Sequence, residues 1–516
     1  MTTGDPVKQI RDLRRLLDLY REGFPILKEL VQNAEDAQAS CLDYGWLEGL
    51  SQAEHPLLKS PALFFINNGK FDKVDARSLF YFDVSGKSDQ EGTIGKFGLG
   101  LKSVFHLCEA FFYLAPSLPA GSKPSCNIFN PWERSGYHDD WDKFKEEDQK
   151  IIQKHLQSFL KQPEYQSGKW FIVWIPLRQK AHQTIQEKDE NGTHLGTIKT
   201  EFFEKFEVPE FLQKDKYFDQ ISSLLSNLHN LQIIRYWQDG KIKYQAQSNY
   251  DSNYSRLQLK ELEEVLGIQK LFKGKFEIIK YDIEKQDITT ENYYFGNEII
   301  LNQQELIDIL QHEKLKLENT AKIKAHCAVI FTRNCHKLGE KSSLTLRLAT
   351  FLPVPIHGDE KDEIKIDCSS KHSYHLTLHG YFFINYARTK IIGWEYANLR
   401  VKEIQVQVDR EKSREELETE WNFILYNYLL SHLLESLSQF ADQYSLPPSE
   451  IQAICQSLKS SELNLFNENN LSTIYRKYKY IYRITSNSET WELININERV
   501  LILPSIPELP STAWRK

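Results

Sequence analysis

Glycines recur at short intervals between positions 92 and 100 and lead into an apolar stretch, in the run GTIGKFGLGLKSVFHL. The apolar stretch predicts a helix, and the free amides at the N-terminus of a helix carry partial positive charge. Residues without a β-carbon let oxyanions come within hydrogen-bonding distance of such amides. The chemistry that this run could perform is therefore phosphate binding, with backbone amides as the donors.

A glycine pattern of this kind is weakly specific when it stands alone. The run lacks the preceding buried strand of a dinucleotide-binding fingerprint, and no clear acidic residue closes a following strand about 20 residues later. It also lacks the Gly-Lys-Ser/Thr ending of a Walker loop. Other parts of the chain must therefore identify the kind of phosphate site.

A second segment with chemical potential runs from Tyr20 to Ala37 and reads YREGFPILKELVQNAEDA. At 3.6 residues per turn its apolar residues form one stripe, and Glu29, Asn33 and Asp36 project from the opposite side. An acid, an amide and a second acid thus share one face of the predicted helix. Taken alone, this pattern is more typical of an ordinary amphipathic surface helix.

Between these two segments, the run ALFFINNGKF has a continuous apolar core that ends in Asn67, Asn68 and Gly69. Such a core predicts a buried strand that delivers two amide side chains to its end. A plain junction between a strand and a turn would give the same local pattern. The order of the three segments is more informative than any one of them.

That order is E-x-x-x-N-x-x-D on a helix, a strand ending in N-N-G, and G-x-x-G-x-G before a helix, and it resembles the sequence boxes of the GHKL ATPases. The superfamily joins gyrase, the ninety-kilodalton heat-shock chaperones, histidine kinases and MutL. The runs ILKELVQNAEDA, INNGKF and IGKFGLGLKSVFH are most similar to sacsin and its bacterial relatives. The resemblance implies a Bergerat ATP-binding α/β sandwich, a mixed sheet with helices on one face, followed by an α/β middle-type domain.

The resemblance also implies a role for each matching residue. Glu29 would be the general base that orients the attacking water, and Asn33 would coordinate the Mg²⁺ that bridges the phosphates of ATP. Asp36 would support the pocket. The residues implied to bind the nucleotide are Asn33, Asp36, Asn67, Asn68, Gly69, Lys87, Gly95, Lys96, Gly98 and Gly100.

The strand end departs from the pattern of the chaperones, in which an aspartate reads the adenine amino group. Here Asn67 takes that place, with Asn68 as the alternative register, and an amide can both accept and donate where a carboxylate only accepts. Residues 71–93 correspond to the mobile lid of the family, and Lys87 is expected to close on the γ-phosphate. Either Lys96 or Lys102 is a further candidate for a charge partner of the phosphates.

Three runs in the second half of the chain look like the segment that follows the ATPase domain in sacsin repeats: LATFLPVPI, HLTLHGYFFINYARTK and EWNFILYNYLLSHLLESL. Their counterpart in the chaperones is the middle domain. A basic pair, Arg388 and Lys390, is expected to end the second run as a strand. By analogy with the middle-domain arginine of the chaperones, Arg388 would reach the γ-phosphate in the closed state.

The length and composition fit this reading. A chain of 516 residues with 41% hydrophobic residues is long enough for about two to four domains with real cores. We expect an ATP-binding domain at 1–200, a middle-type α/β domain at 201–440 and a small C-terminal α/β segment at 441–516. The run WFIVWIPLR, residues 170–178, resembles the strand that closes the nucleotide-binding domain of the sacsin-like proteins.

Charge and cysteine usage narrow the partners. The sequence pI is about 6.1, so no overall positive field draws the chain to nucleic acid or to anionic lipid. Seven scattered cysteines, with no secretory leader and no apolar run of about 18 residues, favour a reducing cytoplasm and no membrane. The expected function is slow, Mg²⁺-dependent ATP hydrolysis that drives a chaperone-type conformational cycle on a protein client. The alternative is a nucleotide-gated regulatory or scaffolding switch, for example in bacterial defence, in which binding matters more than turnover.

Overall fold

The computed structural model describes residues 6–19, 22–71, 100–116, 123–133, 139–180, 196–213, 215–238, 240–251, 269–281, 287–301, 304–312, 315, 325–334, 341–350, 352–354, 363–385, 390–394, 412–459, 480–484 and 491–495. The chain groups into two compact units. Unit 1 comprises residues 1–248 and 277–290, and unit 2 comprises residues 249–276 and 291–516. The predicted division at residues 200 and 440 stays a prediction.

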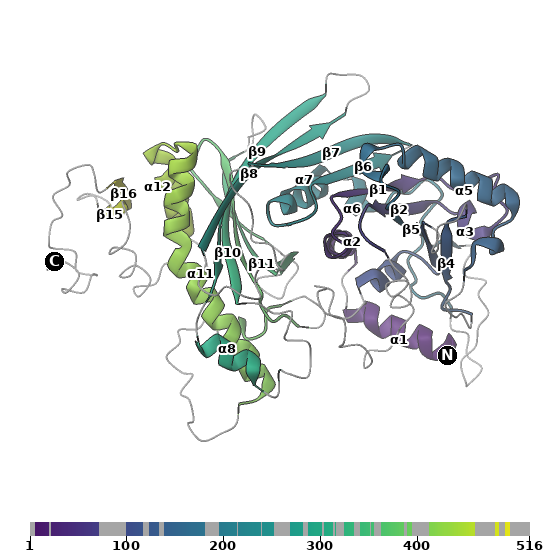
Figure 1. Ribbon diagram of the computed structural model, residues 1–516, viewed down its shortest axis with the longest axis horizontal. Helices are drawn as coiled ribbons and strands as arrows, with labels where there is room; N and C mark the ends of the chain where they lie inside the picture. The colour runs from purple at the N-terminus through teal and green to yellow at the C-terminus, as the bar shows by residue number, and fades with distance from the viewer. Residues whose placement is uncertain are drawn as a thin grey trace. The chain divides into compact units, whose positions relative to one another are not determined.

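A mixed sheet forms the centre of unit 1 (Figure 1). Its strands lie in the order β6-β1-β2-β5-β3-β4, with β7 paired to β6. Strand β1 is parallel to β6, and each other pair is antiparallel. The strands span Cys41–Leu47 (β1), Ala62–Asn67 (β2), Phe111–Ala115 (β3), Ser125–Phe129 (β4), Phe171–Pro176 (β5), Ile233–Gln238 (β6) and Lys241–Tyr250 (β7).

Helix α5, Glu146–Phe159, covers one face of this sheet. Most of its charged residues face solvent, but Asp148 is buried and accepts the Glu54 and His55 amides. Ile152, Leu156 and Phe159 are buried in a core with side chains from β1, β2, β3 and β5. The acidic residues in its first turn interact favourably with the positive end of the helix dipole. Burial of the apolar stripe therefore fixes α5 on the sheet.

Aromatic side chains line the opposite face of the sheet. Tyr44 of β1 lies between Phe65 of β2 and Tyr236 of β6, and Phe218 of helix α7 stacks on Tyr244 of β7 with a centroid separation of 4.9 Å. Helix α7 spans Asp215–Ser223. The predicted α/β class with a mixed sheet is confirmed, with the difference that helices cover both faces rather than one.

The remaining elements of unit 1 connect these layers. Helix α1, Pro6–Leu19, and the 3₁₀ helix η1, Gly100–His106, pack against each other, and η1 also packs against α2, Phe24–Asp36. The short connecting helices are α3 (Pro56–Lys59), α6 (Glu210–Gln213), η2 (Trp141–Lys143), η3 (Pro163–Tyr165) and η5 (Leu224–Ser226).

Unit 2 is also built on a mixed sheet. Strand β10 pairs antiparallel with β9 and β14, β14 pairs parallel with β11, and β12 and β13 pair antiparallel with β11. Strands β8 and β9 contain residues of both units. The bounds are Gln269–Lys280 (β8), Ile288–Ile300 (β9), His326–Asn334 (β10), Ser343–Thr350 (β11), Leu352–Val354 (β12), Ile364–Asp367 (β13) and Ser373–Gly380 (β14).

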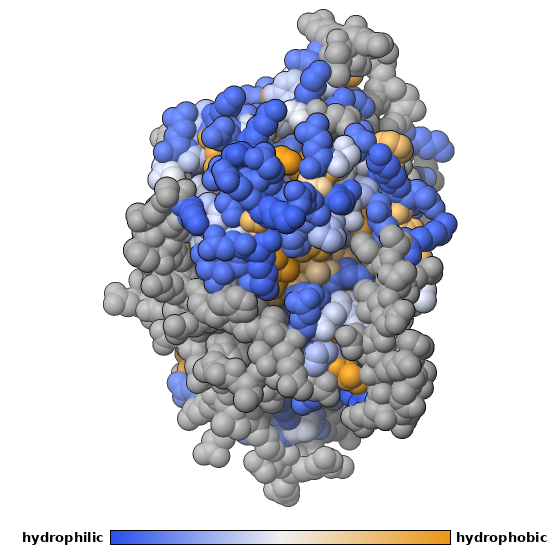
Figure 2. All heavy atoms as spheres, turned by 90° about the vertical axis from the view of Figure 1, so that its right-hand side faces the viewer, coloured by the Kyte–Doolittle hydropathy of each residue, from blue (hydrophilic) through white to orange (hydrophobic). Residues whose placement is uncertain are grey.

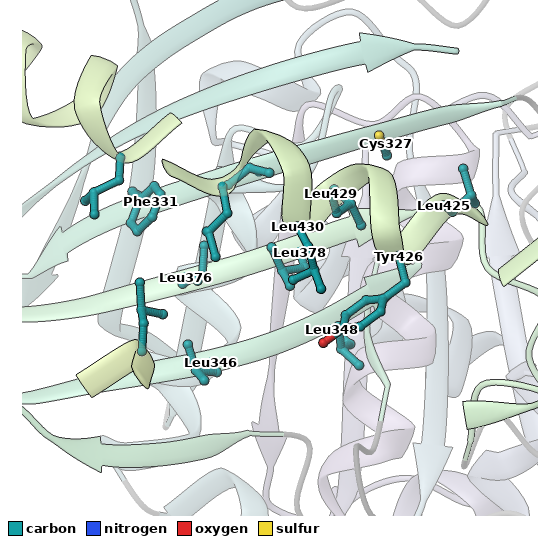
Figure 3. Close-up of a cluster of buried hydrophobic side chains, with 14 of the residues drawn as sticks. Cys327, Phe331, Leu346, Leu348, Leu376, Leu378, Leu425, Tyr426, Leu429 and Leu430 are labelled. Carbon is teal, nitrogen blue, oxygen red and sulfur yellow. The ribbon is translucent and has the colours of Figure 1, made fainter. Parts of the chain in front are cut away.

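Helix α11, Arg414–Tyr444, lies along one face of this sheet. It begins with a capping box, in which Ser413 and Glu416 satisfy each other's backbone amides. Figure 3 shows its leucines, among them Leu425 and Leu429, pointing onto side chains of β10, β14 and β11. The predicted helix at 420–437 is confirmed and is longer at both ends. Helices α8 (Gln304–Gln311) and α12 (Pro448–Lys459) join the same core.

The strand predicted up to Lys390 is too long, because β14 ends at Gly380. After that residue the backbone makes only an isolated bridge among the described residues, between Ile384 and Ile391. The Phe383 amide donates to Oδ1 of Asn422 at 2.6 Å, and Nδ2 of Asn422 donates to the Phe383 and Ile392 carbonyls at 2.8 Å. Asn422 on α11 and this bridge therefore replace the longer ladder of a strand.

Two further antiparallel strands, Tyr480–Ile484 (β15) and Trp491–Asn495 (β16), confirm the strands predicted in the C-terminal segment. The described residues on the face shown in Figure 2 are mostly hydrophilic, and their apolar side chains form small separate areas. Among the described residues, the large apolar side chains that stand out as exposed are Phe206 and Ile288. No helix in the described part of the chain is both long and apolar enough to cross a membrane.

Candidate functional site

Helix α2 carries the first group of predicted site residues. It starts after Gly23, whose φ of 85° is a conformation that favours glycine, and Pro25 occupies its first turn as predicted. The helix is buried on more than its apolar side, because Lys28, Glu29, Gln32 and Glu35 are buried as well. The alternative of an ordinary amphipathic surface helix is therefore wrong.

Glu29 lies directly against the start of η1. A β-carbon at position 100 would lie 2.2 Å from Oε2 of Glu29, so a larger residue here would displace the carboxylate. The hydroxyl of Ser103 donates to the Gly100 carbonyl at 2.6 Å and thereby fixes the first turn of η1. The structure thus brings together the predicted catalytic acid and the last glycine of the predicted phosphate loop.

The two other polar residues of this helix face are more accessible. Asn33 and Asp36 are both half-buried, whereas Glu29 is buried. The Asn33 carbonyl accepts the Ala37 amide at 3.1 Å and so belongs to the end of the helix. An amide and a carboxylate that are only half-buried can exchange solvent for a ligand at lower cost than buried groups can.

The end of strand β2 separates the two candidate adenine readers. Oδ1 of Asn68 accepts the Ser40 and Cys41 amides at 2.8 and 3.0 Å, and its Nδ2 donates to Ser40 Oγ and to the Glu164 carbonyl. Asn68 is therefore committed to holding β1 and β2 together. Oδ1 of Asn67 accepts the Gly69 amide at 3.0 Å, and its Nδ2 has no hydrogen-bond partner among the described residues, so Nδ2 is the better candidate for a ligand donor.

Gly69 has a packing role that the sequence does not reveal. A β-carbon there would lie 2.5 Å from Cβ of Ala37 and 2.8 Å from its carbonyl oxygen. The Ala37 carbonyl also accepts the Lys70 amide at 2.9 Å. The end of β2 and the end of α2 can approach this closely only because residue 69 is glycine, and this approach brings Asn67 near α2.

Lys102, one of the two lysines proposed as charge partners, is buried in η1. Burial lowers the pKa of its ammonium group to about 8, because the charged form is disfavoured away from water. Five other predicted site residues lie outside the described residues, and their roles stay predictions: Lys87, Gly95, Lys96, Gly98 and Arg388.

Sequence reasoning missed Glu35, which anchors the C-terminal part of α2. Its carboxylate accepts the consecutive amides of His229, Asn230 and Leu231 at 2.7 to 2.9 Å, and Nδ2 of Asn230 at 3.1 Å. These partners lie about 195 positions away along the chain. The only sequence signal is a second acid beside Asp36, and periodicity cannot assign it a partner.

A buried ion pair that the sequence also does not reveal holds strands β1 and β6 together. The guanidinium of Arg235 donates to the carboxylate of Asp43 at 2.8 Å and to Glu164 at 2.8 Å. Asp43 also accepts from the hydroxyl of Tyr165 and from the indole of Trp237. This cluster fixes β1 against β6.

The described groups fit magnesium in their chemistry. A carboxylate and an amide oxygen are suitable partners for a hard cation and its bound water, and the Glu29 carboxylate lies beside Gly100, where a β-carbon of that residue would be. Glu29, Asn33, Asp36 and Gly100 come from α2 and η1, which pack against each other. The arrangement can orient a water molecule next to a bound phosphate.

Comparison with known proteins shows what this region is similar to. Residues 7–246 match the model of the Sacsin domain, and this range contains α2, β2 and η1. Part of the chain is also similar to human sacsin, with 33% identity over 128 residues. That match covers 23% of this chain and only 3% of sacsin. The predicted resemblance to sacsin is confirmed for this part of the chain, and membership of the GHKL ATPases stays a prediction.

Proposed function

We propose that unit 1 binds Mg²⁺-ATP at α2, the end of β2 and the start of η1, and that it hydrolyses ATP slowly to drive a chaperone-type conformational cycle. The observation that carries the proposal is the close approach of Glu29 and Gly100, in which the carboxylate lies where a β-carbon of residue 100 would be. The match of residues 7–246 to the Sacsin domain supports a sacsin-related function.

Each described residue has a part in this proposal. Glu29 accepts a hydrogen bond from the attacking water and takes its proton. Asn33 would hold the metal, Asp36 would support the pocket, and Nδ2 of Asn67 would donate to the base. A bound Mg²⁺ would neutralise charge on the phosphate oxygens.

The effect of Glu29→Gln on turnover tests the catalytic claim. The amide keeps the size of the side chain but cannot take a proton, so we expect phosphate release to fall by about 10² to 10⁴ with little change in nucleotide affinity. Glu54→Gln is a matched control, because Glu54 is an exposed partner of Lys145. Phosphate release by the wild-type protein that does not exceed that of Glu29→Gln would remove the ATPase claim.

Client assays separate the chaperone from the nucleotide-gated switch. A chaperone should suppress aggregation of unfolded clients in a manner that depends on ATP and is lost in Glu29→Gln. Tight ATP binding without turnover, together with a stable complex with one defined partner and no effect on several clients, would establish the switch instead. Incubation with labelled ATP checks a third class, since a histidine kinase would become a phosphoprotein.

A further inference from the structure

Arg178 stands at the end of strand β5 and is completely buried. All its guanidinium N–H groups have acceptors: Nε donates to Glu109, Nη1 to the carbonyls of His106 and Glu201, and Nη2 to those of Phe105 and Cys108. The backbone of Arg178 joins the same segment, because its amide donates to the Leu107 carbonyl at 2.7 Å.

Two of these acceptors, the carbonyls of Phe105 and His106, belong to the last turn of η1, and the Cys108 carbonyl follows two residues after its end. The last carbonyls of a helix have no partner within the helix, and they form the negative end of its dipole. A guanidinium satisfies both needs, because it is positively charged and presents its donors in a rigid planar fork. Arg178 is therefore a C-terminal cap for the helix whose first residue is Gly100.

Glu109 holds the guanidinium in place from the side. Its carboxylate also accepts the Ile198 amide at 3.1 Å and the Trp132 indole at 3.0 Å. Burial raises the pKa of Glu109, and the charge of Arg178 opposes that rise. The pair thus connects η1, β5 and the segment around Ile198.

We propose that Arg178, fixed by Glu109, is a positioning residue for the nucleotide site, a role that rests on the proposed function. Arg178 sets the angle at which η1 presents Gly100 to Glu29. A 3₁₀ helix rises about 2 Å per residue, so the cap lies about 12 Å from Gly100 along η1. A small rotation at the capped end therefore displaces Gly100 relative to the carboxylate, and a displacement of about 1 Å can cost about 10² in rate.

Arg235 provides a matched control within the same unit. It is buried like Arg178 and is paired with the buried acid Asp43. Its described partners, Cys41, Asp43, Gln162 and Glu164, lie on β1 and near η3, and none belongs to η1. Changing either arginine should therefore lower the stability of unit 1, so an effect on stability does not distinguish the two residues.

The test compares Arg178→Lys with Arg235→Lys by thermal unfolding, Mg²⁺-ATP affinity and steady-state phosphate release, all well below the melting temperatures. A lysine has one charged nitrogen and cannot reach the carbonyls that the fork spans. We expect both variants to have a lower melting temperature. Only Arg178→Lys should lose at least tenfold in kcat, and its Kd for Mg²⁺-ATP should change by a smaller factor than its kcat. Arg235→Lys should stay within about twofold of wild type in both constants.

Glu109→Gln is a second test in case Arg178→Lys does not fold. It leaves Arg178 in place, so the carbonyls at the end of η1 keep their donor. We expect it to lower kcat in the same direction and by a smaller factor. Wild-type kcat in the folded variants at position 178 or 109 would overturn this inference alone. A wild-type protein that does not bind Mg²⁺-ATP would overturn the proposed function and this inference with it.

Discussion

Helices α2 and α11 are held in place by different forces. Helix α11 has 31 residues and is fixed in unit 2 mainly by a long apolar stripe, with Asn422 as a polar anchor, whereas the 13-residue α2 in unit 1 buries Lys28, Glu29, Gln32 and Glu35 among its apolar residues. The polar groups of α2 make directional bonds, such as those that the Glu35 carboxylate accepts from three backbone amides. Apolar burial has no preferred direction.

This difference teaches where orientation matters. An apolar stripe secures a helix against a sheet but tolerates small rotations and repacking. Hydrogen bonds to backbone groups weaken steeply when their angle changes, so they fix a helix in one orientation. We infer that α2 is held by polar anchors because Glu29 must face Gly100, and that α11 has no such requirement.

The largest effect on stability is expected in α11. Leu429 is fully buried against the strands of unit 2, and Leu429→Ala would leave a cavity there (Figure 3). We expect a loss of about 3 kcal/mol in the free energy of unfolding, measured by urea denaturation. Ser438→Ala, at a half-buried position of the same helix, should change it by less than about 0.5 kcal/mol.

The comparison predicts that Leu429→Ala leaves the Kd for Mg²⁺-ATP and the kcat unchanged in the folded protein. A helix fixed by apolar contacts contributes stability without setting the geometry of a site in another unit. A tenfold loss of ATP affinity in Leu429→Ala would contradict the proposed division between the two helices.

A smaller loss of stability with a larger functional effect is expected for Glu35→Gln. The amide keeps one acceptor oxygen, so part of the group of amides at 229–231 loses its partner, at a cost of about 1–3 kcal/mol. Because these bonds orient α2, the variant should also weaken Mg²⁺-ATP binding, as measured by titration calorimetry. Glu164→Gln, which alters another acid of unit 1, serves as the control. If Glu35→Gln loses stability but binds Mg²⁺-ATP with wild-type affinity, the polar anchors of α2 contribute only stability, as the apolar stripe of α11 does.

The smallest effect concerns the entry to α2 and depends on pH. Burial and a hydrogen bond with the Glu201 carboxyl raise the pKa of Glu22 from 4.5 to about 7. Because this pKa is higher in the folded chain, protonation of Glu22 stabilises the folded protein. This stabilisation is full below pH 4.5 and is lost as the pH rises through about 7. Glu22→Gln should therefore match wild type at low pH and be more stable at pH 8.

The difference should be small, because Glu22 is exposed as a whole and solvent screens its charge. Melting temperatures of both proteins between pH 4.5 and pH 8 measure it. Glu204→Gln changes an exposed acid that pairs with Lys180, and we expect parallel curves for that control. Parallel curves for Glu22→Gln would remove the carboxyl pair as a source of pH dependence.

The elements that could be predicted from the sequence are those that leave a pattern in hydrophobic periodicity and composition. The helix with Glu29 and the strand that ends at Asn67 follow from apolar spacing and from the positions of proline and glycine. The anchors could not be predicted, because Glu35 and Arg178 bind partners that are distant in sequence and are mostly backbone atoms. Backbone acceptors and donors have no sequence signature, so a buried charge that binds them looks like any surface charge.

The buried cysteines described in the structure divide equally between the two units. Cys41, Cys108 and Cys126 belong to unit 1, and Cys327, Cys368 and Cys455 belong to unit 2. A buried thiol reacts with an alkylating reagent only when its surroundings open. Alkylation rates read by mass spectrometry at the two sets would therefore time the opening of each unit separately, with and without nucleotide, using reporters that the chain already contains.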